Sequence, residues 1–175
     1  MKRLALFLVP ALLLCACQTQ QSGPRTVAAA GPQQQAAFDH LKTLQGKWEG
    51  TGQDGKTHVL SVFTVSSSNS IVQETMFPGM PHEMTNVYHL DGPSVLVTHY
   101  CAMGNQPHMR ATGEDKGVIS FHCDSVSNMT SPDQGYMGEL TIAFKDKDHV
   151  TETWRDTKAG KITEKPTVIE LTRAK

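Results

Sequence analysis

The chain has 175 residues, which is enough for one domain of roughly 150 residues and short additional segments. Hydrophobic residues make up 38% and charged residues 19%, a composition that supports one packed core and excludes a fully disordered chain. Sixteen basic and 17 acidic side chains give a formal net charge of -1, so there is no basic excess to indicate a nucleic-acid partner.

Residues 1–16 have the pattern of a secretory signal. A basic start, Met1-Lys2-Arg3, precedes an apolar run over 4–14, which is shorter than the roughly 20 residues that a membrane-spanning helix needs. The next residues, Leu14-Cys15-Ala16-Cys17, resemble the lipobox of bacterial lipoproteins. That resemblance implies cleavage before Cys17 and lipidation of this cysteine. An ordinary signal peptide without lipidation is the alternative.

Lipidation at Cys17 would make the lipid bilayer a partner of the chain and place the protein in the cell envelope. Gln18 follows the cysteine, and by the same resemblance the absence of aspartate there favours the outer membrane, facing the periplasm. The segment 17–35 is rich in Gln, Ala, Gly and Pro without apolar periodicity. It is predicted to be a lipidated flexible tether, and the folded domain is expected over 36–175.

The domain is predicted to begin with a short amphipathic helix, because Phe38, Leu41 and Leu44 recur at helical spacing before Gly46. Beyond the helix, segments rich in β-branched and aromatic residues alternate with turn residues. These segments are 59–65, 70–77, 84–90, 95–103, 118–123, 140–144, 149–154 and 167–172, with two more strands near Lys47 and Met109. Short strands with tight turns avoid exposed edges by closing. We therefore expect an all-β, up-and-down antiparallel β-barrel of about 8–10 strands with a short N-terminal helix.

The segment 44–52 resembles the first strand of the calycins, the superfamily of lipocalins and fatty-acid-binding proteins. In that superfamily a Gly-x-Trp follows a short helix, as Gly46-Lys47-Trp48 does here. An arginine near the end of the last calycin strand commonly covers the tryptophan. The resemblance implies that Trp48 closes one end of the barrel and that the guanidinium of Arg173 stacks on it. The alternative is that Trp48 is an ordinary core residue of another β fold.

A second resemblance covers most of the remaining domain. The stretch 82–109, and the chain through Trp154 to the end, resemble uncharacterised bacterial proteins of this barrel type. The sequence departs from them at His108, where an arginine is expected. This resemblance supports the fold and leaves the function open.

A candidate ligand site lies in the polar segment 98–110. If 104–107 forms a hairpin loop, Cys101 faces Arg110, and alternation places both with His99 on an inward, mostly apolar face. A buried arginine needs an internal carboxylate, such as Asp124 or Glu74, or a ligand anion. An apolar interior with a few convergent polar groups is typical of small-molecule sites. The predicted ligand-binding residues are His99, Cys101, Arg110, Tyr88, Tyr100, Asn105 and Gln106.

The same residues have a structural alternative. A histidine on an apolar strand is commonly a hydrogen-bonded core residue, and Asn105 and Gln106 have the chemistry of turn residues. Cys101 and Cys123 are the cysteines that remain after Cys15 and Cys17. Export favours a disulfide between them, but a meander places them two strands apart, farther than the ~7 Å between α-carbons that a disulfide allows. The strand order therefore favours free thiols.

An alternative metal site consists of Met76, Met80, His82 and Met84. Thioether and imidazole groups suit Cu(I), although the spacing matches no recognised metal motif and methionines also fill cores. The sequence has neither a nucleophile elbow nor a phosphate-binding loop, so an enzyme is not favoured and no cofactor is predicted. The prediction is a membrane-tethered envelope lipoprotein that binds a small, partly apolar ligand. The alternatives are a periplasmic copper-binding protein and a structural envelope protein with a filled barrel.

Overall fold

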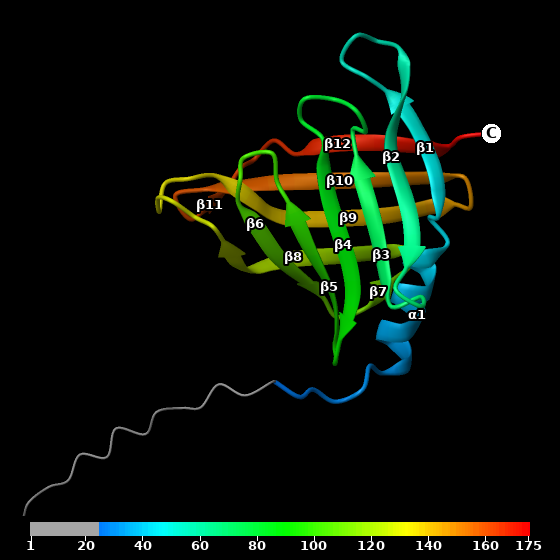
Figure 1. The fold of residues 1–175 in the computed structure, drawn as a ribbon, viewed down its shortest axis with the longest axis vertical. Helices are drawn as coiled ribbons and strands as arrows, with labels where there is room; N and C mark the ends of the chain where they lie inside the picture. The colour runs from blue at the N-terminus through cyan, green and yellow to red at the C-terminus, as the bar shows by residue number, and fades with distance from the viewer. Residues whose placement is uncertain (1–24) are drawn as a thin grey trace, which may run out of the picture.

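A computed structural model describes residues 25–175, which form a closed antiparallel β-barrel of ten strands with one short helix (Figure 1). The predicted fold class is therefore confirmed. The predicted signal peptide and Cys17 lie outside the described residues. The helix α1 spans Pro32–Lys42, and the strands are β1 (Gly46–Thr51), β2 (Thr57–Ser66), β3 (Ile71–Met76), β4 (Met84–Asp91), β5 (Ser94–Tyr100), β6 (Gln106–Ala111), β7 (Glu114–Asp115), β8 (Val118–Ser127), β9 (Tyr136–Asp146), β10 (His149–Lys158), β11 (Lys161–Ile162) and β12 (Thr167–Arg173). In the part of the chain described, no helix is long and apolar enough to cross a membrane.

The barrel is a meander in which consecutive long strands are neighbours. Each long strand from β1 to β10 pairs antiparallel with the next, and β10 pairs with β12. The two-residue strands β7 and β11 only extend the edges of β8 and β10. Strand β12 then returns to β1, with Trp48 opposite Arg173 and Glu49 opposite Thr172. Closure leaves no long unpaired strand edge among the strands of residues 25–175.

Helix α1 covers one end of the barrel, which we call the helix end. Ala37, Phe38 and Leu41 bury one face of the helix against the core. His40 of α1 also contacts the barrel, because its ring stacks on Phe144 of β9 with ring centroids 3.6 Å apart. The opposite end, which we call the open end, carries the loops 52–56, 77–83, 101–105, 128–135 and 159–166 (Figure 1). The two ends therefore differ in that only one is closed by a helix.

The helix end has the tryptophan–arginine pair that the calycin resemblance implies. Trp48 is fully buried, and its indole N–H donates a hydrogen bond to the Leu44 carbonyl at 2.6 Å. The Cζ atom of Arg173 lies 4.3 Å from the centroid of the Trp48 ring. The same guanidinium donates to the carbonyls of Thr43 and Gln45. Arg173 thus joins the last strand to the segment between α1 and β1.

Contacts with the barrel begin before residue 36, where the sequence places the start of the domain. Helix α1 already starts at Pro32, and proline suits the first helical position because its missing N–H is not needed there. Farther upstream, the Arg25 guanidinium bonds both carboxylate oxygens of Asp91, at 2.8 and 2.6 Å. Residues 25–35 of the predicted tether therefore include part of the folded unit.

Candidate functional site

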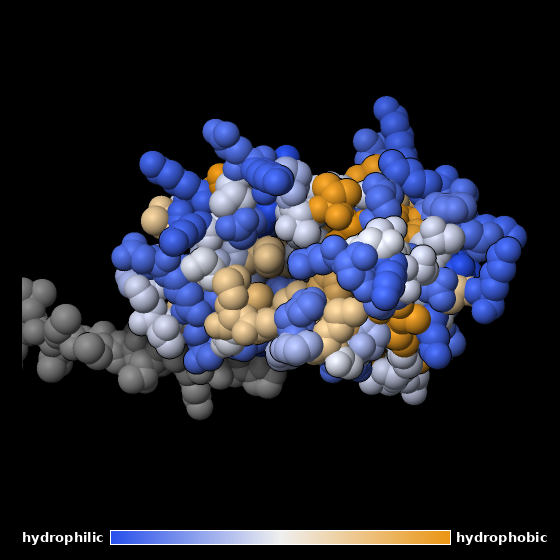
Figure 2. All heavy atoms as spheres, turned by 90° about the horizontal axis from the view of Figure 1, so that it is seen from above, coloured by the Kyte–Doolittle hydropathy of each residue, from blue (hydrophilic) through white to orange (hydrophobic). Residues whose placement is uncertain are grey.

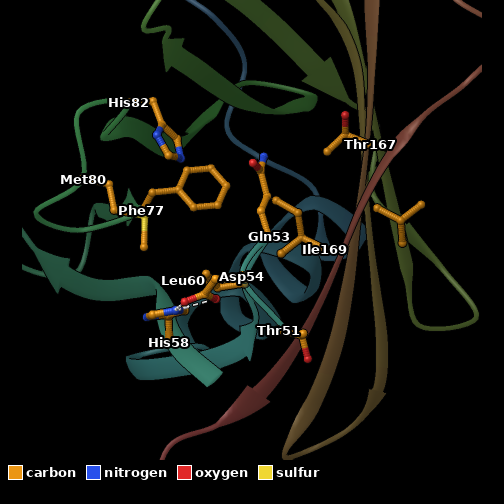
Figure 3. A pocket seen from close by; sticks show the side chains of 12 residues that line it. Thr51, Gln53, Asp54, His58, Leu60, Phe77, Met80, His82, Thr167 and Ile169 are labelled. Atoms are coloured by element: carbon orange, nitrogen blue, oxygen red, sulfur yellow. Dashed lines mark hydrogen bonds and ion pairs between the residues drawn. The ribbon is translucent and has the colours of Figure 1, made fainter. Parts of the chain in front are cut away.

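A cleft of about 500 Å³ opens at the open end of the barrel. It lies between the β1–β2 hairpin, the β3–β4 loop and the start of β12. Figure 2 looks onto this end and shows apolar surface in the hollow between hydrophilic loops. The apolar walls come mainly from Leu60, Phe77, Met80 and Ile169. In Figure 3 the Phe77 ring points across the cleft toward the side that carries Ile169.

Polar side chains stand at the rim of the cleft. His58 Nε2 lies 2.9 Å from the carboxylate of Asp54 (Figure 3). Hydrogen bonds from the Lys56 backbone N–H and from His58 hold the pKa of Asp54 below its usual value. Gln53 and His82 complete the polar part of the rim. The cleft therefore combines an apolar wall with a few polar groups at its mouth.

A second, smaller cavity of about 50 Å³ lies beyond the cleft, and we call it the inner cavity. It is lined by Met76, Phe77, Met84, His99, Met137, Trp154, Thr167 and Ile169. Phe77, Thr167 and Ile169 line both spaces and separate them. Phe77 has φ +52°, a left-handed conformation that strains an aromatic residue. Strain of this kind is often found at functional sites.

Next to the inner cavity, the barrel interior holds a hydrogen-bonded network around the carboxyl group of Glu74. Ser61 Oγ donates to one oxygen at 2.6 Å, and Asn86 Nδ2 and Tyr88 OH donate to the other at 2.7 and 3.0 Å. All four side chains are buried. Burial raises the pKa of Tyr88 well above its ordinary value, so its hydroxyl remains a donor. Buried polar groups need such partners, and Glu74 has three donors.

Glu152 is a second buried carboxyl group in the neighbourhood of Glu74. The Trp154 indole N–H donates to Glu152 Oε2 at 3.0 Å. Burial, together with the neighbouring Glu74, raises the pKa of Glu152 well above the usual value. Burial also raises the pKa of Glu74, but the three donors oppose that rise. Glu152 Oε1 has no hydrogen-bond partner in the described structure, so burial favours the protonated form of Glu152 more strongly than that of Glu74.

The hydrogen bonds determine which nitrogen of His99 carries the proton. Asn86 uses its amide N–H to donate to Glu74, so its Oδ1 atom is left to accept from His99 Nδ1 at 2.7 Å. His99 is then protonated on Nδ1, and Nε2 has a free lone pair. Burial lowers the pKa of His99 to about 4, so the ring is neutral at pH 7. Nε2 is buried without a hydrogen-bond partner in the described structure, and the ring lines the inner cavity.

The predicted ligand-binding residues divide between the interior and other places. His99 and Tyr88 face the interior, as expected, and both belong to the Glu74 network. Tyr100 lies on the outside and is 48% exposed. Cys101 is buried at the end of β5 but lines neither the cleft nor the inner cavity.

The prediction that Arg110 faces the interior is wrong. The β5–β6 turn is closed between Cys101 and Asn105, which places Leu96, and not Cys101, opposite Arg110. Arg110 therefore lies on the outer face of β6, where it pairs with Asp91 and Asp124. Hydrogen bonds to these carboxylates raise the pKa of Arg110. Asp124 was one of the partners that the sequence suggested, but the pair forms outside the barrel.

Asn105 lies in the β5–β6 turn, and Gln106 is the first residue of β6. Asn105 is buried, and its amide donates to the Gly135 carbonyl at 2.8 Å, which joins the β5–β6 turn to the β8–β9 loop. Gln106 donates to the Gly104 carbonyl at 3.1 Å. Cys101 and Cys123 are free thiols, and burial raises the pKa of both. None of these four residues lines the cleft or the inner cavity.

The four residues of the alternative metal site do not come together. Met76 and Met84 line the inner cavity, whereas Met80 and His82 line the outer cleft. Within residues 25–175, no group of three His, Cys, Asp or Glu side chains is arranged to hold a metal ion. The four residues that the sequence suggested therefore cannot bind one metal ion together, because they line two different spaces.

Sequence reasoning named Glu74 only as a possible internal partner of Arg110 and missed Glu152. Glu74 lies between the buried residues Val72 and Met76, at a position where β3 faces the core. Glu152 lies in the same way between Val150 and Trp154 on β10. An acidic residue in phase with an apolar, inward-facing row is the signal that could have found each of them.

Comparison with known proteins finds no family model and no curated protein that matches this chain. The resemblance to the calycins therefore stands at the level of architecture. A closed antiparallel barrel of ten strands is compatible with a calycin-like fold.

Proposed function

We propose that the protein is a binding protein whose barrel takes a small, largely apolar ligand at its open end. The observation that carries the proposal is the cleft of about 500 Å³, since small-molecule sites have volumes of roughly 300–1,000 Å³ and are mainly apolar. Phe77, Thr167 and Ile169 form the inner boundary of the cleft and separate it from the inner cavity.

The side chains around the cleft favour an uncharged ligand. Leu60, Phe77 and Ile169 offer apolar contact, and Gln53 and His82 at the rim can hydrogen-bond a polar end. Neither Lys nor Arg is among the side chains that line it, and Asp54 adds a carboxylate. An anionic group on the ligand, which was expected from an inward Arg110, therefore has no support here.

The proposal includes a membrane anchor. The lipobox-like sequence before Cys17 supports an envelope lipoprotein tethered through that cysteine. The outer membrane, with the barrel facing the periplasm, is the location that the residue after Cys17 favours. The anchor would hold the binding domain near a lipid surface, where apolar molecules are concentrated.

A matched pair of threonine substitutions tests the ligand site. Thr167 lines the cleft at the start of β12, whereas Thr64 is exposed on β2 and lines neither space. Thr167→Trp fills part of the cleft, so it should weaken binding of an uncharged apolar dye such as Nile red about tenfold or more. Thr64→Trp adds the same side chain elsewhere and should leave the affinity unchanged.

Two results would contradict this proposal. Equal dye affinity in Thr167→Trp and in the unsubstituted chain would show that the dye binds elsewhere. Absence of saturable binding, together with a native mass equal to that of the bare chain, would favour a structural protein with a filled barrel. An additional organic mass in native mass spectrometry would identify the natural ligand.

A further inference from the structure

We propose that the inner cavity binds a soft monovalent metal ion, Cu(I) or Ag(I), through His99 Nε2 and methionine thioethers. Met84 and Met137 line the cavity with His99, and Met76 provides a third thioether. The proposal concerns the inner cavity and goes beyond ligand binding in the outer cleft. It differs from the site suggested by the sequence, since Met80 and His82 belong to the outer cleft.

The chemistry of the lining selects a soft ion. Thioethers and neutral imidazole are ligands that suit Cu(I), whereas Mg²⁺, Ca²⁺ and Mn²⁺ prefer carboxylate and carbonyl oxygen. No carboxylate is among the residues that line the inner cavity. Three methionines and one histidine, from β3, β4, β5 and β9, converge on a space of about 50 Å³. A space of this size suits an ion or a very small molecule.

A soft metal ion would use more of this lining than a water molecule would. A buried water usually makes two to four hydrogen bonds to polar partners. The side chains of the lining that can bond a water are His99, whose Nε2 has no partner, and Thr167. A soft metal ion takes the imidazole nitrogen and the thioethers of the methionines as ligands.

The groups behind His99 are those expected behind a metal-binding histidine. His99 Nδ1 donates to Asn86 Oδ1, and the Asn86 amide donates in turn to Glu74. Metal-ligating histidines usually donate their other N–H to a carboxylate or carbonyl oxygen, which fixes the tautomer and the ring orientation. The hydrogen bond to Asn86 has this effect on His99 before any metal is bound.

An aromatic ring also lines the site. The centroid of the Trp154 ring lies 4.8 Å from that of His99, and Trp154 lines the inner cavity. An aromatic face beside the cavity can stabilise a desolvated cation.

Methionine-methyl NMR tests the site without relying on a substitution at the site. Ag(I) is the probe because it is soft and redox-stable. All four cysteines are replaced by serine, since thiolates would otherwise compete for the ion. One equivalent of Ag(I) should shift the methyl signals of Met84 and Met137 and leave that of Met109 in place. Shifts at Met80 alone, or no saturable shift, would overturn the proposal.

Leucine substitutions then identify the ligands. Met84→Leu and Met137→Leu keep the side-chain volume but remove the sulfur, and each should weaken Ag(I) binding about tenfold or more. Met80→Leu in the outer cleft and Met109→Leu elsewhere in the core are the matched controls and should bind as before. Equal affinity in all four variants, with folding verified by circular dichroism, would overturn the proposal. Dye binding tests the outer cleft and Ag(I) binding tests the inner cavity, so one proposal can be contradicted while the other is supported.

Discussion

The buried carboxyl groups make the interior of this barrel sensitive to pH. Glu74 and Glu152 are fully buried, and burial, together with the neighbouring Glu74, raises the pKa of Glu152 well above its usual value. His99 acts in the opposite direction, because burial lowers its pKa to about 4. Each shift changes the free energy of unfolding over a different range of pH.

Glu152→Gln should stabilise the protein at neutral and higher pH. The folded chain keeps the Glu152 proton, but the unfolded chain loses it above its ordinary pKa of 4.5. The free energy of unfolding is therefore highest below that pH and falls as pH rises, by up to about 1.4 kcal/mol per pH unit, until the pH passes the folded pKa. Glutamine keeps the neutral form and removes this loss. Urea unfolding across a pH series measures the difference.

The comparison is clearest above pH 6.5. His99 contributes a loss of stability as pH falls from 6.5 toward about 4, so its effect is absent above that range. Glu164→Gln, at an exposed position, controls for the loss of one surface charge. If the stability difference between Glu152→Gln and the unsubstituted protein does not depend on pH, the raised pKa is wrong.

At the scale of elements, the β12–β1 pair closes the barrel and Arg173 strengthens it. The pair has only two residue pairs in register, whereas β2 and β3 have six. Arg173 stacks on Trp48 and donates to the carbonyls of Thr43, Gln45 and Lys147. One side chain thus links the last strand, the first strand and the β9–β10 turn.

Arg173→Lys is expected to destabilise the fold even though it keeps the positive charge. Lysine cannot donate to three carbonyls in the fixed geometry of a guanidinium, and it lacks the planar group that stacks on Trp48. We expect a loss of about 2 kcal/mol in the free energy of unfolding, from the lost stacking and hydrogen bonds. Chemical denaturation measures it. Lys147→Ala, at a side chain that is 90% exposed, should be nearly neutral, and a similar loss there would contradict this role.

The elements were predictable because each leaves a local signal. Alternation and turn residues located the ten strands, and the helical spacing of Phe38 and Leu41 located α1. The β5–β6 register was not predictable, because 101–105 and 104–107 both contain residues that favour turns. The observed register differs from the expected one by five residues, since Leu96 replaces Cys101 opposite Arg110. An odd shift turns a side chain to the other face of the sheet, and Arg110 therefore points outward.

The candidate site was predictable only in part, for a related reason. The inward direction of His99 follows from alternation along its own strand. The approach of Glu74 to Glu152 depends on the closure of the barrel, because β3 and β10 are far apart in the sequence. The same holds for Met137, which joins Met84 in the inner cavity from β9. Contacts of this kind need the three-dimensional arrangement.

At the scale of the whole molecule, the N-terminal side and the cleft are at opposite ends. Arg25 pairs with Asp91 at the β4–β5 turn, and α1 covers the same end. The cleft opens between the β1–β2 and β3–β4 loops at the other end (Figure 1). The described chain therefore begins at the end of the barrel opposite the cleft. Binding and anchoring should then be separable.

Cys17→Ala should release the protein from the membrane without changing its binding site. With its own signal sequence, the unsubstituted chain should fractionate with membranes and be extracted only by detergent, because two or more acyl chains give stable anchoring. The Cys17→Ala chain should be found in the soluble fraction and bind Nile red with unchanged affinity. Mass spectrometry of the N-terminus provides the control, since it should show a lipid mass on Cys17 in the unsubstituted chain. A membrane-bound Cys17→Ala chain, or cleavage at another residue without lipid, would contradict the proposed anchor.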